Sequence, residues 1–190
     1  MKKILAIALA TACVTSFGAS FSWSTSTKTA FDGATVGGVS AVLVYLGATD
    51  TLTGSAIAIN KESTVDSIAS SIGTKTTSTA TSVASGKTKG KLSGTYEFTS
   101  GVNDGDYFAV LMSYSSGDKT FFNISSTFQG AFDSASNTWS PVSTTATWST
   151  TSDKATSISA NGGWVAAVPE PSTAALALAG LALLLKRRKA

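Results

Sequence analysis

The 190-residue sequence contains no histidine and only one cysteine, Cys13. Histidine is the side chain most often used for acid–base catalysis, so its absence argues against an enzyme. Cys13 lies in a segment that we expect to be removed on export. The remaining chain would then have no disulfide, no thiolate metal ligand and no cysteine nucleophile. We therefore expect neither a metal site nor a cofactor.

Charged residues make up only 13% of the chain, and the positive ones are concentrated at its two ends. Residues 21–168 contain eight lysines, no arginine and ten acidic residues, so this part has a net charge of about −2, although the whole chain is at +3. Binding to nucleic acid requires a basic surface that displaces counterions. The charge distribution therefore excludes nucleic acid as a partner and indicates a separate role for the basic ends.

The first 20 residues have the pattern of a secretory signal peptide. Two lysines precede a short apolar run at 4–12, and the small residues Gly18 and Ser20 suit cleavage after Ser20. This pattern predicts export through the Sec translocon and removal of the peptide by signal peptidase. The residues before Cys13 leave an alternative open, a lipobox that ends at Cys13 and directs its lipidation.

The last 23 residues, 168–190, have the pattern of a second targeting segment. Val168-Pro169-Glu170-Pro171 comes first, and each proline keeps the residue before it extended, which is the conformation that a protease cleft accepts. An uncharged run at 172–185 follows, and its alanines and leucines favour a helix. The basic stretch Lys186-Arg187-Arg188-Lys189 should stay in the cytoplasm under the positive-inside rule.

The uncharged run is short for a membrane span. Its 14 residues give a helix of about 21 Å, against a hydrocarbon core of about 30 Å. Long basic side chains and local thinning of the bilayer make up part of the difference. We therefore predict a transmembrane anchor at about 172–185, with a buried C-terminal helix and an anchor that is never cleaved as alternatives. The anchor positions are Leu176, Leu178, Gly180, Leu181, Leu183, Leu184 and Leu185.

Val168-Pro169-Glu170-Pro171-Ser172-Thr173, Gly180-Leu181 and the basic end at 186–189 together resemble the C-terminal segment of the PEP-CTERM family of bacterial envelope proteins. The resemblance covers about an eighth of the chain. It implies recognition by an exosortase, a membrane-embedded cysteine transpeptidase that cuts near the Pro-Glu-Pro. The passenger, which is the part of the chain at 21–160, would then be released or joined to another envelope component. The resemblance implies nothing about the passenger's own activity.

The passenger is expected to consist mainly of β-structure. About a third of its residues are serine or threonine, which suit solvent-facing strand positions and polar loops. Apolar runs rich in β-branched and aromatic residues predict strands at 38–46, 56–60, 91–99, 107–114, 119–125, 128–132, 138–139, 146–149 and 155–158. The runs at 107–114 and 119–125 flank a short Gly-Asp turn and predict a β-hairpin.

One segment favours a helix. Ser63 and Asp66 resemble a capping box, apolar residues recur at helical spacing up to Ile72, and Gly73 would end the helix. The polar stretch at 74–89 predicts an exposed loop or edge. The whole pattern predicts a mainly β fold, an antiparallel β-sandwich or a jelly-roll-like domain. Asn161-Gly162-Gly163 would begin a flexible linker at 161–167.

Short patterns that are typical of catalysis or ligand binding fit their context poorly. Gly86-Lys87-Thr88 lacks the glycine that a phosphate-binding loop needs five positions earlier. Ser116-Gly117-Asp118-Lys119 fits Ser-x-x-Lys but falls in the predicted hairpin turn. Asn103, Asp104 and Asp106 offer oxygen ligands for calcium, but their spacing favours a turn. Paired carboxylates for glycoside hydrolysis are allowed by the composition, although most of the acids lie in turn-like contexts.

Trp139 and Trp148 are the candidates for stacking on a sugar ring, because an indole offers a flat apolar face. The opposing interpretation is that some tryptophans fill the core and that Trp164 leads into the membrane-proximal segment. We favour a non-catalytic, exported protein of the cell envelope or extracellular matrix, anchored in the inner membrane before processing and then located at the cell surface or outside it. A surface module that binds extracellular polysaccharide is the alternative, and a secreted hydrolase is the third hypothesis.

Overall fold

A computed structural model describes residues 19–31, 33–98, 102–133, 138–140, 147–149, 152–153 and 156–167. The predicted signal sequence up to residue 18 and the sorting segment at 168–190 lie outside this part. The described residues form fifteen strands and one helix: β1 Ala19–Ser24, β2 Ala30–Phe31, β3 Ala34–Thr35, β4 Ser40–Gly47, β5 Ala56–Ala58, α1 Val65–Ile72, β6 Thr74–Thr81, β7 Ser93–Phe98, β8 Tyr107–Ser116, β9 Lys119–Ile124, β10 Phe128–Gln129, β11 Ala131–Asp133, β12 Thr138–Ser140, β13 Ser152–Asp153, β14 Ser157–Ser159 and β15 Trp164–Ala166.

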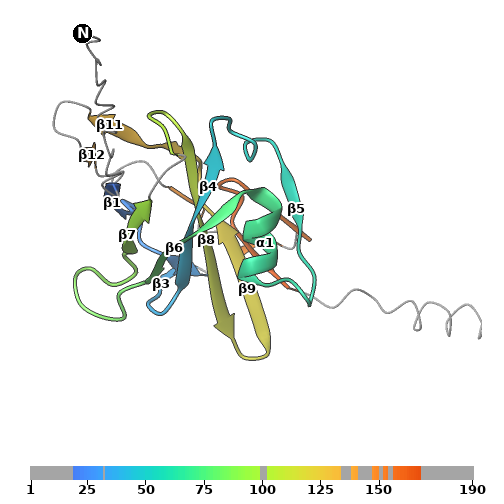
Figure 1. Cartoon of the computed structure of the whole chain (residues 1–190). Coiled ribbons are helices and arrows are strands. Elements are labelled where there is room, and N and C mark those ends of the chain that lie inside the picture. The colour runs from blue at the N-terminus through green and yellow to red at the C-terminus, as the bar shows by residue number, and fades with distance from the viewer. Residues whose placement is uncertain are drawn as a thin grey trace, which may run out of the picture.

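One seven-stranded sheet organises the fold (Figure 1). Its strand order is β13-β15-β9-β8-β4-β6, and β10 also pairs with β8. The pairs are antiparallel except for β13 and β15, which run parallel. The predicted hairpin is confirmed as β8 and β9, in which Ser116 pairs with Lys119 across a two-residue turn. Gly117 takes a φ of 62° in that turn, a conformation that glycine adopts without steric cost.

The central sheet is buried on both faces. Side chains alternate between the faces of a strand, and in β8 the residues Phe108, Val110 and Met112 belong to one core cluster. Ala109 and Leu111 of the same strand belong to a second cluster. This explains why β8 is an almost continuous apolar run, because a strand that is covered on both sides has no solvent-facing positions to alternate with.

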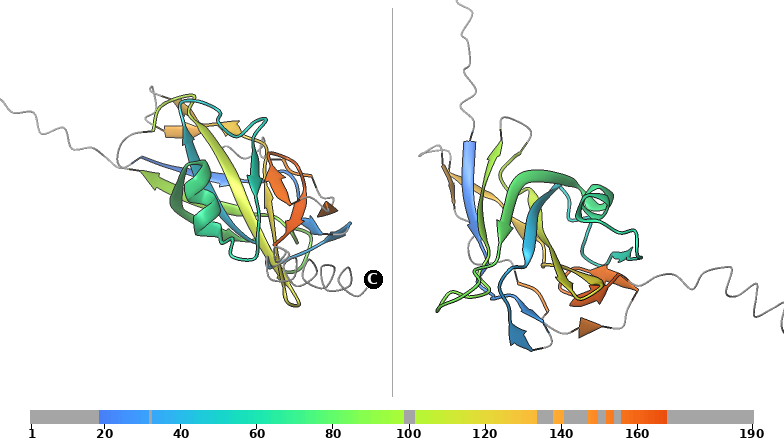
Figure 2. Two further views of the ribbon diagram at one scale, coloured as in Figure 1. Left: turned by 90° about the vertical axis from the view of Figure 1, so that its right-hand side faces the viewer. Right: turned by 90° about the horizontal axis from the view of Figure 1, so that it is seen from below.

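Different elements cover the two faces (Figure 2, right). Trp23 of β1 and Leu92, just before β7, pack in the first cluster. Ile68 and Ala69 of α1 pack in the second. The mainly β, antiparallel class with one short helix is therefore confirmed. Among the described residues, however, the layer of strands over the first face is mainly the pair β1-β7, rather than a second sheet of the size expected for a sandwich.

The helix prediction is confirmed, with its cap one residue later than expected. Thr64 is the N-cap and exchanges hydrogen bonds with Ser67, so the capping box joins Thr64 and Ser67 rather than Ser63 and Asp66. Gly73 ends the helix, and its N–H donates to the Ala69 carbonyl oxygen at 3.0 Å. Its φ of 177° is ordinary extended backbone. Glycine is needed there for space, since an added Cβ would lie 2.3 Å from the Tyr45 carbonyl oxygen.

The prediction of a flexible linker at 161–167 is wrong. Asn161 makes a tight turn with φ 57°, and β15 follows it between β13 and β9 in the main sheet. Trp164 and Val165 are 0% and 1% exposed. The reason is hydrophobic: burial of an indole and a β-branched side chain outweighs the flexibility of the preceding glycines. The folded domain therefore extends to the edge of the sorting segment.

Two other segments differ from the prediction. β1 was not predicted, and it spans the expected cleavage position after Ser20; its pairing with β7 places Trp23 opposite Gly94. Residues 147–149 form no strand, although Trp148 is buried. By contrast, the expectation of a loop or an edge at 74–89 is confirmed for its first half, which is β6, the edge strand beside β4.

Candidate functional site

In sequence, the sorting segment follows directly after β15, an inner strand of the main sheet. In β15, Val165 pairs with Phe122 and Ala166 pairs with Phe121 of β9. The N–H of Ala167 then donates to the Thr120 carbonyl oxygen at 2.8 Å. Val168, the first residue of the predicted sorting motif, is the next residue in the chain. The folded domain and the motif are therefore contiguous, with no spacer between them.

Aromatic side chains hold β15 in place beside this exit. The Trp164 indole donates to the Ala30 carbonyl oxygen at 2.6 Å, which ties β15 to β2. The Phe31 ring lies 4.6 Å from Phe121 and 6.1 Å from Trp164, in both cases edge to face. Tyr114 lies 5.4 Å from Phe31 and 6.4 Å from Trp164. We call Phe31, Tyr114, Phe121 and Trp164 the exit cluster; Trp164 is buried and the other three are half-buried.

The predicted sorting and anchoring residues themselves lie outside the described residues. This applies to the Pro-Glu-Pro at 169–171, the anchor positions at 176–185 and the basic end at 186–189. Within the described part of the chain, no helix has the length and apolar character needed to cross a membrane. The short helix α1 packs on the main sheet instead.

The tryptophans do not form an exposed stacking surface in the described structure. Trp148 is 4% exposed and packs in the first core cluster with Trp23 and Trp164. A sugar ring stacks on an accessible aromatic face, so Trp148 does not offer such a platform and fits the opposing interpretation that some tryptophans fill the core. Trp139 lies in β12, opposite Phe132, but the placement of its side chain is outside the described structure.

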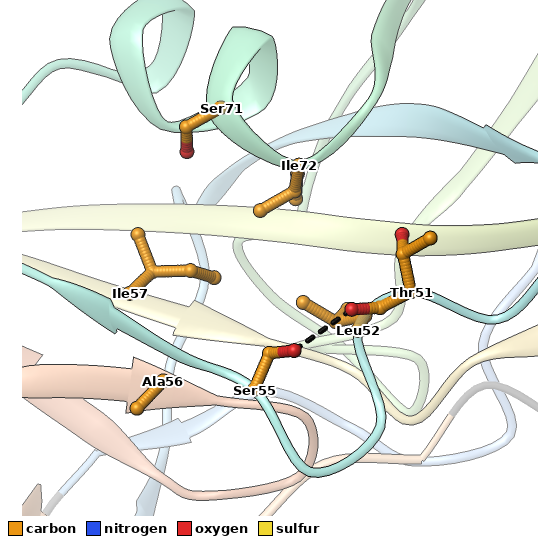
Figure 3. A pocket seen from close by; sticks show the side chains of 7 residues that line it. All are labelled: Thr51, Leu52, Ser55, Ala56, Ile57, Ser71 and Ile72. Carbon is orange, nitrogen blue, oxygen red and sulfur yellow. Dashed lines mark hydrogen bonds between the residues drawn. The ribbon is translucent and has the colours of Figure 1, made fainter.

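One hollow of about 320 Å³ lies between α1 and the segment before and within β5 (Figure 3). The Ser55 hydroxyl at its rim donates to the Thr51 carbonyl oxygen at 2.8 Å. The hollow has apolar walls with a few hydroxyl groups and no charged side chain, so it offers no acid–base pair. Its lining residues are Thr51, Leu52, Ser55, Ala56, Ile57, Ser71 and Ile72.

The predicted turn at 103–106 is held by a buried carboxylate. Asp106 is 3% exposed, and its Oδ2 accepts hydrogen bonds of 2.7 Å from the Asn103 backbone and from the Tyr45 hydroxyl. Burial, followed by the hydrogen bond to Asp106, raises the pKa of Tyr45 to about 12. Across the described residues, no three potential ligands from His, Cys, Asp and Glu gather around a common point. The arrangement closes a turn and fastens it to β4.

Asp50 has a comparable structural role at the loop after β4. It accepts from the backbone N–H groups of Leu52 and Thr53, each at 3.0 Å, and from the hydroxyls of Thr53 and Thr127, each at 2.7 Å. Burial acts to raise the pKa of Asp50, but the bonds from Thr127, Thr53 and Leu52 together lower it to about 2. Both oxygens of the Asp50 carboxylate accept these hydrogen bonds, which fix the loop that borders the hollow.

Comparison with known proteins identifies the C-terminal segment. The PEP-CTERM protein-sorting motif matches residues 167–189, which confirms the resemblance inferred from the Pro-Glu-Pro, the apolar run and the basic end. Neither the curated proteins nor the solved structures contain a match to the chain. A PEP-CTERM motif implies an exported protein that is anchored at the membrane and then processed by an exosortase. The match begins at Ala167, the residue that bonds to Thr120.

Sequence reasoning missed the attachment of the motif to the sheet. The signal was present, because Trp164-Val165-Ala166 is an aromatic and β-branched run of strand length. It was hidden by the preceding Asn161-Gly162-Gly163, which is as typical of a tight turn as of a flexible joint. The structure shows the turn, since the Gly162 N–H donates to the Ser159 carbonyl oxygen at 2.9 Å.

Proposed function

We propose that the protein is a non-catalytic component of the cell envelope or extracellular matrix, exported through an N-terminal signal peptide. Its apolar segment at 172–185 holds it in the inner membrane, with the basic end in the cytoplasm. An exosortase-type transpeptidase then acts near Pro169-Glu170-Pro171 and delivers the β-domain to the cell surface or the extracellular space.

The observation that carries the proposal is the sorting-motif match at residues 167–189. A sorting motif supplies an address rather than an activity, so the role of the β-domain needs separate support. Three of its acids are engaged in structure: Asp50 fixes a loop, Asp106 closes a turn, and Asp66 forms an ion pair with Lys75. Acids with these roles are poor candidates for general acids or nucleophiles, which supports a non-catalytic domain.

The test is the intact mass of the protein recovered from envelope and extracellular material of cells that contain an exosortase. Replacement of Pro169, Glu170 and Pro171 by alanine should leave the uncleaved form, which keeps its C-terminal segment. Pro141→Ala is the matched control, because Pro141 is the only other proline of the chain. An unchanged mass distribution in the triple variant would rule out sorting through this motif.

A further inference from the structure

We propose that the end of the domain formed by the β8–β9 turn and the exit cluster faces the lipid surface while the protein is anchored. The proposal rests on the proposed function, because it requires the segment at 172–185 to be inserted in the membrane. It adds an orientation: one end of the β-domain lies against the headgroups, and the other points away from the bilayer.

β15 runs toward the β8–β9 turn. β15 is antiparallel to β9, and successive residues 165, 166 and 167 lie beside Phe122, Phe121 and Thr120. The chain therefore leaves the sheet while running toward Lys119 and the β8–β9 turn. Figure 1 shows that this hairpin projects beyond the neighbouring strands. The exit point and the turn thus lie at the same end of the domain.

The segment between β15 and the predicted anchor is short. Only residues 168–171 separate Ala167 from the uncharged run that starts at Ser172. A chain spans at most about 3.5 Å per residue. The five residue-to-residue steps from Ala167 to Ser172 therefore reach no more than roughly 17 Å in any conformation. Thr120, which bonds to Ala167, must therefore lie within about that distance plus one hydrogen bond of the membrane interface. Residues 168–171 thus limit the distance between this end of the domain and the bilayer. This limit favours lipid, rather than another protein, as the surface that this end contacts.

The side chains at this end suit the headgroup region. Ser115, Ser116, Asp118 and Lys119 are exposed around the turn and offer hydroxyls and both signs of charge. Phe31, Tyr114 and Phe121 of the exit cluster are half-buried, so part of each side chain is accessible at this end. Aromatic rings with polar neighbours are favoured at the membrane–water interface.

The opposite end of the sheet is far from the tether. Gly47, at the end of β4, pairs with Tyr107, whereas the turn follows Ser116 at the other end of β8. The nine steps from Tyr107 to Ser116 span about 30 Å at 3.3 Å per residue. Thr49, which is exposed in the loop after β4, is therefore a matched reference position that should remain in water.

The experiment uses the full chain with Cys13→Ser, so that a cysteine introduced elsewhere is unique. Ser116→Cys and Thr49→Cys are each labelled with the same fluorophore after far-UV circular dichroism has shown that the fold is kept. Both are reconstituted into phosphatidylethanolamine–phosphatidylglycerol vesicles that contain a headgroup spin-labelled lipid. We expect several-fold stronger quenching at position 116 than at position 49.

A spacer variant tests whether the short tether causes the orientation. A glycine–serine insert of about 12 residues between Ala167 and Val168 adds roughly 20 Å of average reach. Quenching at position 116 should then fall toward the value at position 49, while the protein still floats with the vesicles.

Equal quenching at the two positions, or stronger quenching at position 49, would overturn the inference. Loss of flotation would instead show that the segment at 172–185 does not anchor the chain, and the proposed function would fail first. Selective crosslinking of position 116 to a membrane protein in cells, without quenching in vesicles, would assign this end to the processing enzyme and also overturn the lipid assignment.

Discussion

The N–H of Ala167 and the carbonyl oxygen of Thr120 form a 2.8 Å hydrogen bond, two residues before Pro169. This bond ends the pairing of β15 with β9, and the sorting segment begins at once. A transpeptidase that acts near the Pro-Glu-Pro would therefore cut just outside the last paired strand. The main sheet and both core clusters would remain complete in the processed protein.

A pair of truncations tests the role of β15 in the domain. A chain that ends at Ala167 should keep its free energy of unfolding, because the described core is intact. A chain that ends at Gly163 loses the buried side chains of Trp164 and Val165 and should be destabilised by about 3–5 kcal/mol or fail to fold. Urea denaturation measures the difference. Equal stability of the two chains would mean that residues 164–167 are a linker after all.

Gly73→Ala should destabilise the fold through steric overlap. The added Cβ would approach the Tyr45 carbonyl oxygen to 2.3 Å, so the end of α1 or strand β4 would have to shift. Overpacking of this kind costs about 1–3 kcal/mol. Thermal unfolding of Gly73→Ala and of the control Ser70→Ala, at an exposed position of the same helix, measures the effect. A Gly73→Ala protein as stable as the control would contradict the close approach of α1 to β4.

Asp50 should contribute stability that is lost in acid. Its pKa is lowered to about 2 in the folded protein, against about 3.9 in an unfolded chain. The contribution is therefore complete above pH 4 and disappears as the pH falls from about 4 to about 2. One pKa unit corresponds to about 1.4 kcal/mol, and the partial exposure of Asp50 reduces the effect, so we expect about 1–2 kcal/mol.

The measurement is the free energy of unfolding of the wild type and of Asp50→Asn from pH 7 to pH 2. The difference between the two proteins should shrink across the window from pH 4 to pH 2. Thr49→Ala, which changes an exposed and uncharged side chain in the same loop, is the control and should leave the difference from wild type constant. A pH-independent difference for Asp50→Asn would refute the role given to its hydrogen bonds.

Tyr45 should contribute stability that is lost in alkali. Its pKa is raised to about 12, so the folded protein keeps the neutral phenol at a pH where an unfolded chain has already lost the proton. The contribution is complete below about pH 10, the ordinary tyrosine value, and is lost as the pH rises to about 12. Tyr45→Phe removes a hydrogen bond to the buried Asp106 carboxylate and should cost about 1–3 kcal/mol at neutral pH.

The same variant gives a second readout. Burial also raises the pKa of Tyr96, so the tyrosine absorbance titration of the native protein should lose part of its late component in Tyr45→Phe and keep the part that belongs to Tyr96. The gap in unfolding free energy between wild type and variant should narrow between pH 10 and pH 12. Tyr107→Phe, at a half-buried position on β8, is the control. A late component of unchanged amplitude in Tyr45→Phe would contradict the assignment to Tyr45 and leave it to Tyr96 alone.

Leu181→Asp should release the protein from the membrane fraction. A carboxylate near the centre of an inserted helix costs about 2.5–3.5 kcal/mol of insertion free energy, and a short span has little apolar length to offset it. Flotation of vesicles or fractionation of cells measures the change, with Leu181→Ala as the control. Membrane association that is unchanged in Leu181→Asp would count against an inserted segment at 172–185.

Local features were predictable from the sequence. The β8–β9 hairpin needs two strands joined by a two-residue turn, and all its determinants lie within 107–124. The helix α1 was predictable for the same reason, since its cap and its end are set by Thr64 and Gly73. The cap was misplaced by one residue because Ser63 and Thr64 are both suitable N-cap side chains; Ser63 bonds to Asn60 instead.

Features that depend on distant partners were not predictable. β1 pairs with β7, and the paired residues run from Ala19 with Phe98 to Ser24 with Ser93, about 70 or more positions apart; nothing in the sequence of β1 identifies that partner. The sequence was compatible with an exposed or a buried Trp148, and Trp148 is buried because the first core cluster packs around it. The two roles open to such a ring, stacking on a ligand and filling a core, use the same side chain, so only its surroundings distinguish them.

The sequence by itself determined the destination of the protein and the β-character of its domain, because sorting motifs, strand propensities and tight turns are local properties of the chain. Only the tertiary structure decided that residues 164–167 belong to the folded domain. Residues 164–167 have too few local contacts to be stable as a strand alone, and they become one because β9 and β13 pair with them and the exit cluster buries Trp164. Non-local pairing and burial thus place the sorting motif directly beside the folded sheet.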